Sequence, residues 1–375
     1  MLRPIFGCLG HLCQLLRANI KPLILLASFG TFIWLIVSTT NRPEFTRHAA
    51  RQQLLAEDKI DFNNRWNENT VQIFLRMLDI RGNVTDLAKD SGACPLKDEV
   101  VFTAFMGETL EEQLWQYFTL IALRQNADVS DENKSQIKPF LSQFSKQQLQ
   151  QIFENVPMEA IGDLPFDCYD IANALIVISS MDIPRPERVN QIFILDDGAR
   201  RYQDLVATKW DQETDMLRLA SAESANHRLA KLRERSPLRE NSAQGVEFVG
   251  IYIRRDDHLP FEYYYRAIAL QRKLHQARLI FVVICEDAQG KLCKQIAAPA
   301  EEIYVQQAKA ANETGHDFAL MALCNHTIVS NELGIFHALI SGGDVVVYEF
   351  SDEDDRMQYV PWSIASEMDR WYMLG

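Results

Sequence analysis

Two adjacent arginines and two aspartates directly follow a run of apolar residues in the second half of the chain. The run, Val246–Ile253, is rich in β-branched and aromatic side chains and ends in Arg254, Arg255, Asp256 and Asp257. Guanidinium groups are rigid forks of donors that suit phosphate or carboxylate oxygens. The residues therefore predict either an anion pocket for a diphosphate or an ordinary strand end with a local Arg–Asp pair.

A short apolar run of this composition predicts a buried β-strand. Ligands of open α/β sheets bind beyond the carboxyl ends of the strands. Because the charged residues begin where the run ends, the predicted strand places them at such a binding edge.

The rest of the chain supplies similar elements. The pattern predicts strands at 99–106, 175–179, 191–195, 246–253, 278–285, 326–329 and 345–348, and helices at 111–124, 261–276, 317–323 and 334–340. The polar segment 126–160 is predicted to be helical, and 206–245 to be a solvated helix face and linker. Strands that alternate with helices predict an α/β fold with parallel sheets and right-handed crossovers.

Composition narrows the class of protein. The chain has 375 residues, of which 47% are hydrophobic and 24% are charged, as in a folded protein with a sizeable core. Its formal net charge of −13 argues against a general nucleic-acid binder, which needs a basic face.

Cysteine usage does not indicate a zinc site. The chain has 7 cysteines, without a CxxC pair or a Cys/His ligand spacing. If the chain beyond the first 2 cysteines is lumenal, 7 − 2 = 5 cysteines lie there, and an odd number leaves at least one unpaired. Disulfides are expected in such a compartment, but the sequence does not give their connectivity.

The amino-terminal region predicts a membrane anchor. Pro22–Thr40 is uncharged and long enough to span a bilayer, and the basic residues Arg3, Arg17 and Lys21 precede it. We interpret it as an uncleaved signal anchor that follows a cytoplasmic tail, 1–21. The alternative is a buried core helix.

The polar segment that follows, 41–98, is predicted to be a stem between the anchor and the folded body. N-glycosylation sequons begin at Asn83, Asn133, Asn312 and Asn325. The first three are candidate glycosylation sites, although sequons give only weak support for a secretory location.

The chain resembles the animal Golgi galactoside alpha-1,2-fucosyltransferases over about residues 100–350. The strongest match is His316–Tyr348, with its DFAL, CNHTI and GGD segments. Gly250–Asp257 is similar to a His-x-Arg-Arg-x-Asp motif that GDP-fucose-using enzymes share. Arg278–Cys293 and Met106–Tyr117 resemble a strand with its following cysteine and a glycine-containing turn.

The chain also departs from the family pattern. Tyr252 stands where the family has histidine, and Asp256 where it usually has glycine. Glu111 and Glu112 replace a Gly-Asn pair, and the turn Asn331–Gly334 has lost a glycine. Glycines at such turns let backbone amides approach a ligand closely, whereas glutamates bring negative charge toward a diphosphate.

The resemblance implies two Rossmann-like domains in a GT-B-like arrangement, 99–235 on the acceptor side and 236–375 for the nucleotide sugar. It implies transfer of L-fucose from GDP-fucose to a galactoside hydroxyl, with inversion, in the Golgi lumen. The expected partners are the nucleotide sugar, a glycan or glycoprotein acceptor, and the membrane through one helix. No cofactor or metal is expected, and the acidic pairs Asp196–Asp197, Asp256–Asp257 and Asp354–Asp355 are interpreted as solvated acids.

The roles that we expect at the central motif concern the leaving GDP. Arg255 is predicted to bind the β-phosphate, with Arg254 sharing it or supporting the loop. Asp257 could act as the general base or orient the arginines. We favour orientation, because neighbouring guanidinium groups would lower the pKa of its carboxyl group.

The resemblance implies further donor-binding residues. Asp317 suits guanine or ribose recognition, or else caps its helix. His326 could contact phosphate or sugar, or be structural. Ser330 could bind phosphate, and Asn325 and Thr327 belong to the same matching run. If Asn325 lines the donor pocket, its sequon should stay unglycosylated.

The sequence leaves two candidate functions. The first is an active Golgi fucosyltransferase. The alternative is a catalytically inactive member that acts as a membrane-anchored glycan- or protein-binding module, which the altered turns favour.

Overall fold

The structure, a computed structural model, describes residues 68–80, 99–128, 136–164, 166, 169, 174–178, 191–196, 201–208, 210, 216–236, 245–257, 259–275, 278–298, 302–310, 313–350 and 360–375. The predicted tail and anchor, and the candidate glycosylation sites Asn83, Asn133 and Asn312, lie outside these residues, as does most of the stem. Among the residues that are described, none of the helices combines the length and apolar character needed to cross a bilayer.

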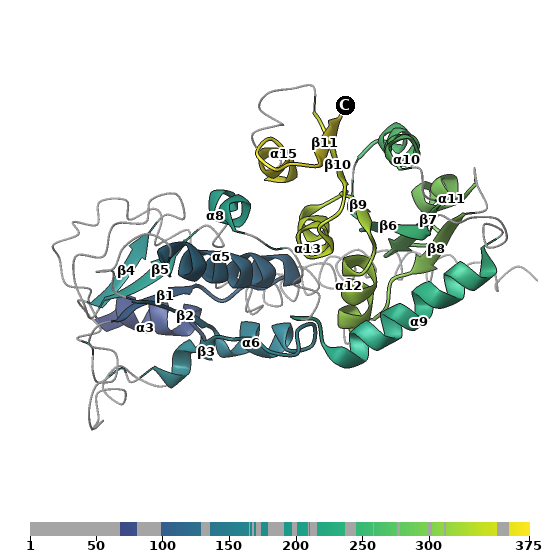
Figure 1. The fold of residues 1–375 in the computed structure, drawn as a ribbon. Coiled ribbons are helices and arrows are strands. Elements are labelled where there is room, and N and C mark those ends of the chain that lie inside the picture. The colour runs from purple at the N-terminus through teal and green to yellow at the C-terminus, as the bar shows by residue number, and fades with distance from the viewer. Residues whose placement is uncertain are drawn as a thin grey trace, which may run out of the picture. The chain divides into compact units, whose positions relative to one another are not determined.

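Two parallel sheets organise the unit that begins at Trp66 (Figure 1). The first sheet has the strand order β3-β2-β1-β5-β4, and the second β11-β10-β9-β6-β7-β8. The strands of the first sheet are β1 (Glu99–Ala104), β2 (Gln136–Leu141), β3 (Glu159–Ala160), β4 (Leu175–Ile178) and β5 (Ile192–Leu195). Those of the second are β6 (Val246–Ile253), β7 (Arg278–Cys285), β8 (Ile303–Gln307), β9 (His326–Ile328), β10 (Val345–Tyr348) and β11 (Trp371–Leu374).

The second sheet has the topology of a nucleotide-binding fold. Counted from its own first strand, the order reads 6-5-4-1-2-3, which is that of doubly wound dinucleotide-binding sheets. The order reverses between β6 and β9, which pair in parallel with Val249 opposite His326. The predicted parallel α/β architecture is confirmed, and the binding crevice of this topology lies beyond the ends of β6 and β9.

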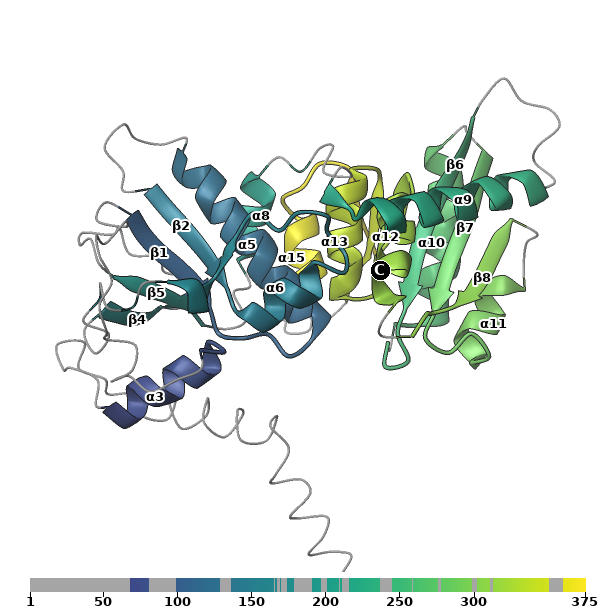
Figure 2. The same ribbon diagram turned by 90° about the horizontal axis from the view of Figure 1, so that it is seen from below.

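Helices connect the strands. They are α3 (Glu68–Met77), α5 (Leu110–Asp128), α6 (Gln143–Leu149), α8 (Tyr202–Ala207), α9 (Leu219–Arg235), α10 (Phe261–Leu274), α11 (Lys291–Ala297), α12 (Thr314–Ala322), α13 (Glu332–Ser341) and α15 (Val360–Ala365), with a short 3-10 helix, η1, at Ile161–Asp163. In Figure 2, α9 runs alongside α12, with Ala225, Leu229 and Leu232 buried.

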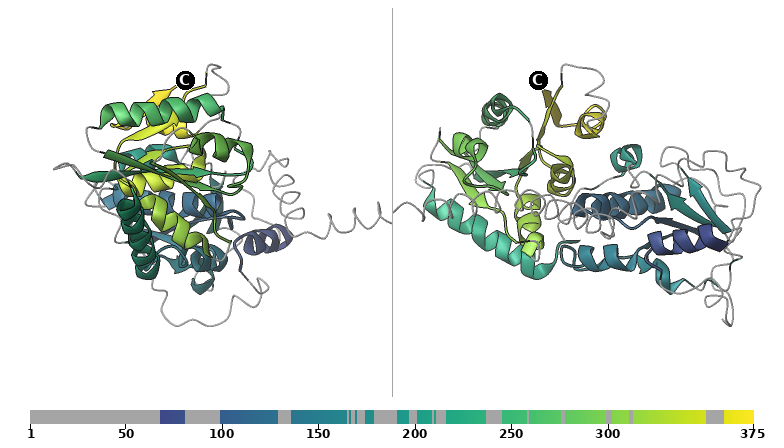
Figure 3. Two further views of the ribbon diagram at one scale, coloured as in Figure 1. Left: turned by 90° about the vertical axis from the view of Figure 1, so that its right-hand side faces the viewer. Right: turned by 180° about the vertical axis from the view of Figure 1, so that it is seen from behind.

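The two faces of the second sheet bury different cores, because side chains alternate along a strand. Val249, Ile251 and Ile253 of β6 pack into a core with residues of α10 and α11. Phe248 belongs to the other core, with residues of α9, α12 and α13. The two views in Figure 3 show α10 on the opposite side of this sheet from α9 and α12. Burial on both faces explains why residues 248–253 of β6 and 279–285 of β7 are continuous apolar runs.

The segment 126–160 differs from its prediction. It was expected to be helical, and α6 is a helix, but the segment also contains the strand β2, which pairs in parallel with β1 so that Val101 lies opposite Lys138. Lys138 lies near Glu159 of β3, with Nζ 3.4 Å from Oε1. Because polar residues such as Lys138 interrupt the apolar pattern, the sequence did not indicate a strand here. Helix propensity was overridden by pairing with a strand distant in the sequence.

A disulfide joins two of the cysteines in the described part of the chain. Cys285, the last residue of β7, forms a disulfide with Cys293 of α11. Cys324 is a free thiol, and complete burial raises its pKa. A thiol in this state is a small apolar core residue rather than a nucleophile.

Candidate functional site

A pocket of about 500 Å³ lies at the switch point of the second sheet. Its lining comes from the loop after β6, the loop after β9 and the turn between β1 and α5, with Phe350 following β10. The described lining residues are Thr109, Glu111, Glu112, Arg254, Asp256, Asp257, Leu259, Ser330, Asn331, Glu332 and Phe350. This volume is in the range of pockets that hold a small ligand.

Arg254 is the guanidinium that faces this pocket. Its Nη1 lies 2.5 Å from Glu111 Oε1, and its Nε lies 3.2 Å from Asp256 Oδ1. Partial burial of Arg254 lowers the pKa of its guanidinium, but Glu111 and Asp256 more than offset this effect, so the pKa is raised. Arg254 is therefore a permanent cation at the end of β6.

Arg255 occupies a different environment from its neighbour. It is exposed in the turn after β6, and its backbone N–H donates to Glu286 Oε2 at 3.2 Å. Among the described residues that line the pocket, Arg254 is present and Arg255 is not. Adjacent residues at a strand end can point in opposite directions. The sequence therefore could not indicate which of the two arginines faces the pocket.

Asp257 is fixed by two hydrogen bonds. Its Oδ2 accepts from the Arg254 backbone N–H at 2.8 Å and from Asn331 Nδ2 at 2.9 Å. Burial outweighs these bonds and the charge of Arg254, and raises the pKa of Asp257 to about 6. The expected net lowering of this pKa is therefore wrong: the charge of Arg254 does lower it, but desolvation is the larger effect.

The loop after β9 supplies two more polar residues. Ser330 Oγ donates to the Tyr252 carbonyl, which also accepts from Asn331 Nδ2 at 3.2 Å. Asn331 caps α13, because its side-chain oxygen accepts from the Gly334 N–H at 3.3 Å. Asn331 therefore joins β6, the β9 loop and Asp257. The sequence analysis missed this role, although Asn followed by a helix is a cap signal.

The turn before α5 is built by a capping box. The Glu112 N–H donates to Thr109 Oγ1 at 3.2 Å, and the Thr109 N–H donates to Glu112 Oε2 at 3.3 Å. This reciprocal pair satisfies amides at the start of a helix. Glu112 therefore has a structural role, whereas Glu111 turns toward Arg254.

Asp317 lies apart from the pocket-lining residues, in the first turn of α12. It is buried, with Oδ1 3.0 Å from Arg228 Nη1 and Oδ2 accepting from the Lys309 N–H at 2.6 Å. The N-cap of α12 is Glu313, so the alternative that Asp317 caps this helix is wrong. Its expected part in guanine or ribose recognition stays a prediction.

Asn325, His326 and Thr327 lie toward the amino end of β9, away from the Arg254 end of the sheet. Asn325 is exposed, and its Oδ1 accepts from the Phe248 N–H at 2.9 Å. Thr327 Oγ1 is 3.4 Å from Ser341 Oγ. The structure thus brings Arg254, Asp257 and Ser330 together, and places the matching CNHT residues elsewhere on the same sheet.

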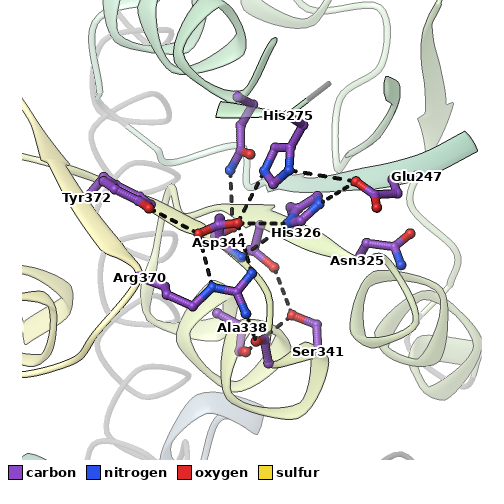
Figure 4. Close-up of polar contacts among 12 residues, drawn as sticks. Glu247, His275, Asn325, His326, Ala338, Ser341, Asp344, Arg370 and Tyr372 are labelled. Carbon is purple, nitrogen blue, oxygen red and sulfur yellow. Dashed lines mark hydrogen bonds and ion pairs between the residues drawn. The ribbon is translucent and has the colours of Figure 1, made fainter. Parts of the chain in front are cut away.

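His326 belongs to a polar network that Figure 4 shows. Its Nε2 is 3.1 Å from Glu247 Oε2, and His275 places Nδ1 3.7 Å from the same oxygen. Asp344 lies 3.3 Å from His275 Nε2 and is held by Arg370 and Tyr372. Burial lowers the pKa of His326.

Glu247, His275 and His326 bring three potential metal-ligand atoms together in the described part of the chain. However, the Asp344 backbone N–H donates to His326 Nδ1 at 3.1 Å. The neutral ring therefore carries its proton on Nε2, where it faces Glu247. A metal would have to displace that proton, so the geometry fits a hydrogen-bonded network that ties β6, β9, β10 and β11 together.

The fold and the site define a class of protein: a doubly wound α/β protein in which an arginine, Arg254, lines a pocket at the switch point of the second sheet. No protein-family model matches the chain, and no curated protein matches it.

Solved structures of glycosyltransferases are similar to the chain at a low level. A fucosyltransferase NodZ from Bradyrhizobium has a TM-score of 0.41 and 14% identity, over 68% of this chain and 96% of that one. NodZ alpha-1,6-fucosyltransferase soaked with GDP-fucose gives 0.41 and 13%, over 68% and 96%. A family 9 glycosyl transferase from Veillonella parvula DSM 2008 gives 0.41 and 16%, over 76% and 88%. Values this low carry no conclusion about the function of this chain.

Proposed function

We propose that the chain is a glycosyltransferase that moves L-fucose from GDP-fucose to a galactoside hydroxyl, in alpha-1,2 linkage and with inversion. The observation that carries the proposal is the position of Arg254, which directly follows β6 at the topological switch point and lines a pocket of about 500 Å³. The choice of GDP-fucose and of the linkage rests on the sequence resemblance, which is strongest over His316–Tyr348 and includes the motif Gly250–Asp257.

The chemistry requires a group that stabilises the charge that develops on the departing diphosphate. A guanidinium fork can do so through charge-assisted hydrogen bonds to two oxygens. Arg254 is positioned for this task by its backbone N–H, which is bonded to Asp257 at 2.8 Å. Loss of one preorganised donor of this kind costs about 10²–10³ in rate.

We assign Asp257 the role of general base, which takes the proton of the acceptor hydroxyl. Both of its hydrogen bonds end on Oδ2, which leaves Oδ1 without a donor among the described residues. A pKa of about 6 makes the carboxylate a better base than an ordinary aspartate and leaves it largely ionised at neutral pH. In this proposal, Oδ1 accepts the acceptor's proton as the sugar oxygen attacks.

The cellular setting is part of the proposal. A type II Golgi membrane protein with its catalytic body in the lumen accounts for the uncharged segment 22–40, the polar stem and the sequons. Asn83, Asn133 and Asn312 are the proposed glycosylation sites.

A second candidate function is favoured by one observation. Arg254 is already paired with Glu111, and the described pocket lining holds five carboxylates, Glu111, Glu112, Asp256, Asp257 and Glu332, against one guanidinium. An acid-rich pocket opposes a diphosphate. The alternative is therefore a non-catalytic member that binds a glycan or protein.

The test is transfer from labelled GDP-fucose by the full chain, purified in a mild detergent, with a panel of β-galactosides and glycoproteins. We expect transfer by the wild type and a loss of about 10²–10³ in rate for Arg254→Ala. Arg255→Ala is the matched control for removal of a neighbouring exposed cation and should keep most of the activity. Absence of both transfer and donor hydrolysis from folded wild type would favour the non-catalytic alternative.

A further inference from the structure

Glu111 occupies a position that suits an anion. It lies in the first turn of α5, a helix of 19 residues, where the macrodipole favours negative charge. The cap of this helix does not involve it, because Thr109 and Glu112 form the capping box. Its side chain is only 14% exposed and points to Arg254 instead.

The contact joins the two sheets at the pocket. Glu111 follows β1 of the first sheet, and Arg254 follows β6 of the second; Oε1 and Nη1 are 2.5 Å apart. Asp256 lies on another edge of the same guanidinium, with Oδ1 3.2 Å from Nε. Glu111 therefore already occupies a donor that a phosphate would need, whereas Asp256 lies beside the guanidinium and Nε makes no hydrogen bond within the described part of the chain.

A carboxylate and a phosphate oxygen compete for the same donors, because both accept charge-assisted hydrogen bonds from guanidinium. When a phosphate binds Arg254 in this pocket, the Glu111 carboxylate must move, since two adjacent anions would repel. A ligand opens such a contact only to the extent that it binds the open state more tightly.

We propose that the Glu111–Arg254 ion pair is a latch that closes the phosphate position of the donor site, with Glu111 standing in for the ligand's anion. This inference rests on the proposed function, because it identifies the ligand as a nucleoside diphosphate. The latch holds the loops before α5 and after β6 together in the free protein. Donor binding releases Glu111.

GDP titrations of the full chain by calorimetry test the latch. Glu111→Gln should bind GDP about 10-fold more tightly than the wild type, because one charge-assisted bond no longer competes. Glu112→Gln is the matched control: it removes the same charge from the same pocket, and glutamine preserves the capping box. It should change the affinity much less.

Equal effects of the two substitutions would overturn the latch, since they would reflect the overall charge of the pocket. Wild type that binds GDP, with Glu111→Gln no tighter, would overturn the latch alone and leave the proposed function standing. No binding by any folded variant would overturn both proposals.

A readout without ligand tests the contact itself. Glu111→Gln and Arg254→Gln, singly and together, form a double-mutant cycle in the midpoint of thermal unfolding. A latch predicts that the double variant loses less than the sum of the two single losses. Strictly additive losses would overturn the latch whatever the GDP titrations give.

Discussion

At the scale of single residues, Asp257 shows how burial can reverse an expectation based on neighbours. Two adjacent arginines predict a lowered carboxyl pKa, yet Arg255 is exposed and burial of Asp257 dominates. The motif itself could be predicted from the sequence, because a buried strand that ends in charges marks a binding edge. The burial of each charge could not, because it depends on loops that meet only in the folded chain.

The raised pKa of Asp257 makes a prediction about stability. A carboxyl group whose pKa rises from 3.8 to about 6 on folding stabilises the fold below pH 3.8, and this contribution is lost as the pH rises through about 6. Asp257→Asn should therefore be more stable than the wild type at pH 7, on the order of 1–3 kcal/mol. An amide oxygen in place of Oδ2 can keep both hydrogen bonds.

Denaturant unfolding of both proteins between pH 4 and 7 measures the effect. The difference in unfolding free energy should grow as the pH rises through about 6. Asp256→Asn, at a side chain that is 68% exposed, is the control for the loss of a neighbouring carboxylate. A constant difference between Asp257→Asn and wild type would contradict the assigned pKa.

At the scale of elements, the central strands of the second sheet could be predicted and its two edge strands could not. The predicted bounds of β6, β7 and β10 match the structure, because strands buried on both faces are continuous apolar runs. β8 and β11 lie at the two edges of the second sheet and were missed. A strand with one neighbour needs less apolar sequence, so its identity is set by the partner strand.

The start of α5 gives a prediction at this scale. Thr109→Ala should lower the free energy of unfolding by about 1 kcal/mol, because the N–H of Glu112 loses its cap. Thr109→Ser keeps the hydroxyl and is the matched control. Chemical denaturation of the two variants measures the difference, and equal stabilities would show that the cap contributes nothing.

At the scale of the whole molecule, one continuous core connects the two sheets. Phe336 of α13 is fully buried, with its ring centroid 5.2 Å from Trp115 and 5.1 Å from Phe118 of α5. Glu332 of α13 accepts a hydrogen bond from Trp115 Nε1 at 2.9 Å. The sequence pattern predicted a helix at 111–124, but not that Trp115 and Phe118 of this helix contact a helix of the other sheet.

A shared core predicts cooperative unfolding of the two sheets. Phe336→Ala should cost about 3–5 kcal/mol and lower a single unfolding transition, since the cavity affects both sheets. Tyr265→Ala, at a residue that is 58% exposed, is the control and should change the stability little. Calorimetry checks the prediction, and two separate transitions, with only one shifted, would contradict it.

The central claim is that the pocket at the end of β6 holds the diphosphate of a nucleotide sugar. The most direct measurement is an experimental structure of the protein with GDP bound. We predict diphosphate oxygens within hydrogen-bond distance of the Arg254 guanidinium, with the Glu111 carboxylate moved from its position 2.5 Å away. GDP bound elsewhere, or a Glu111–Arg254 pair that stays intact beside bound GDP, would contradict the account.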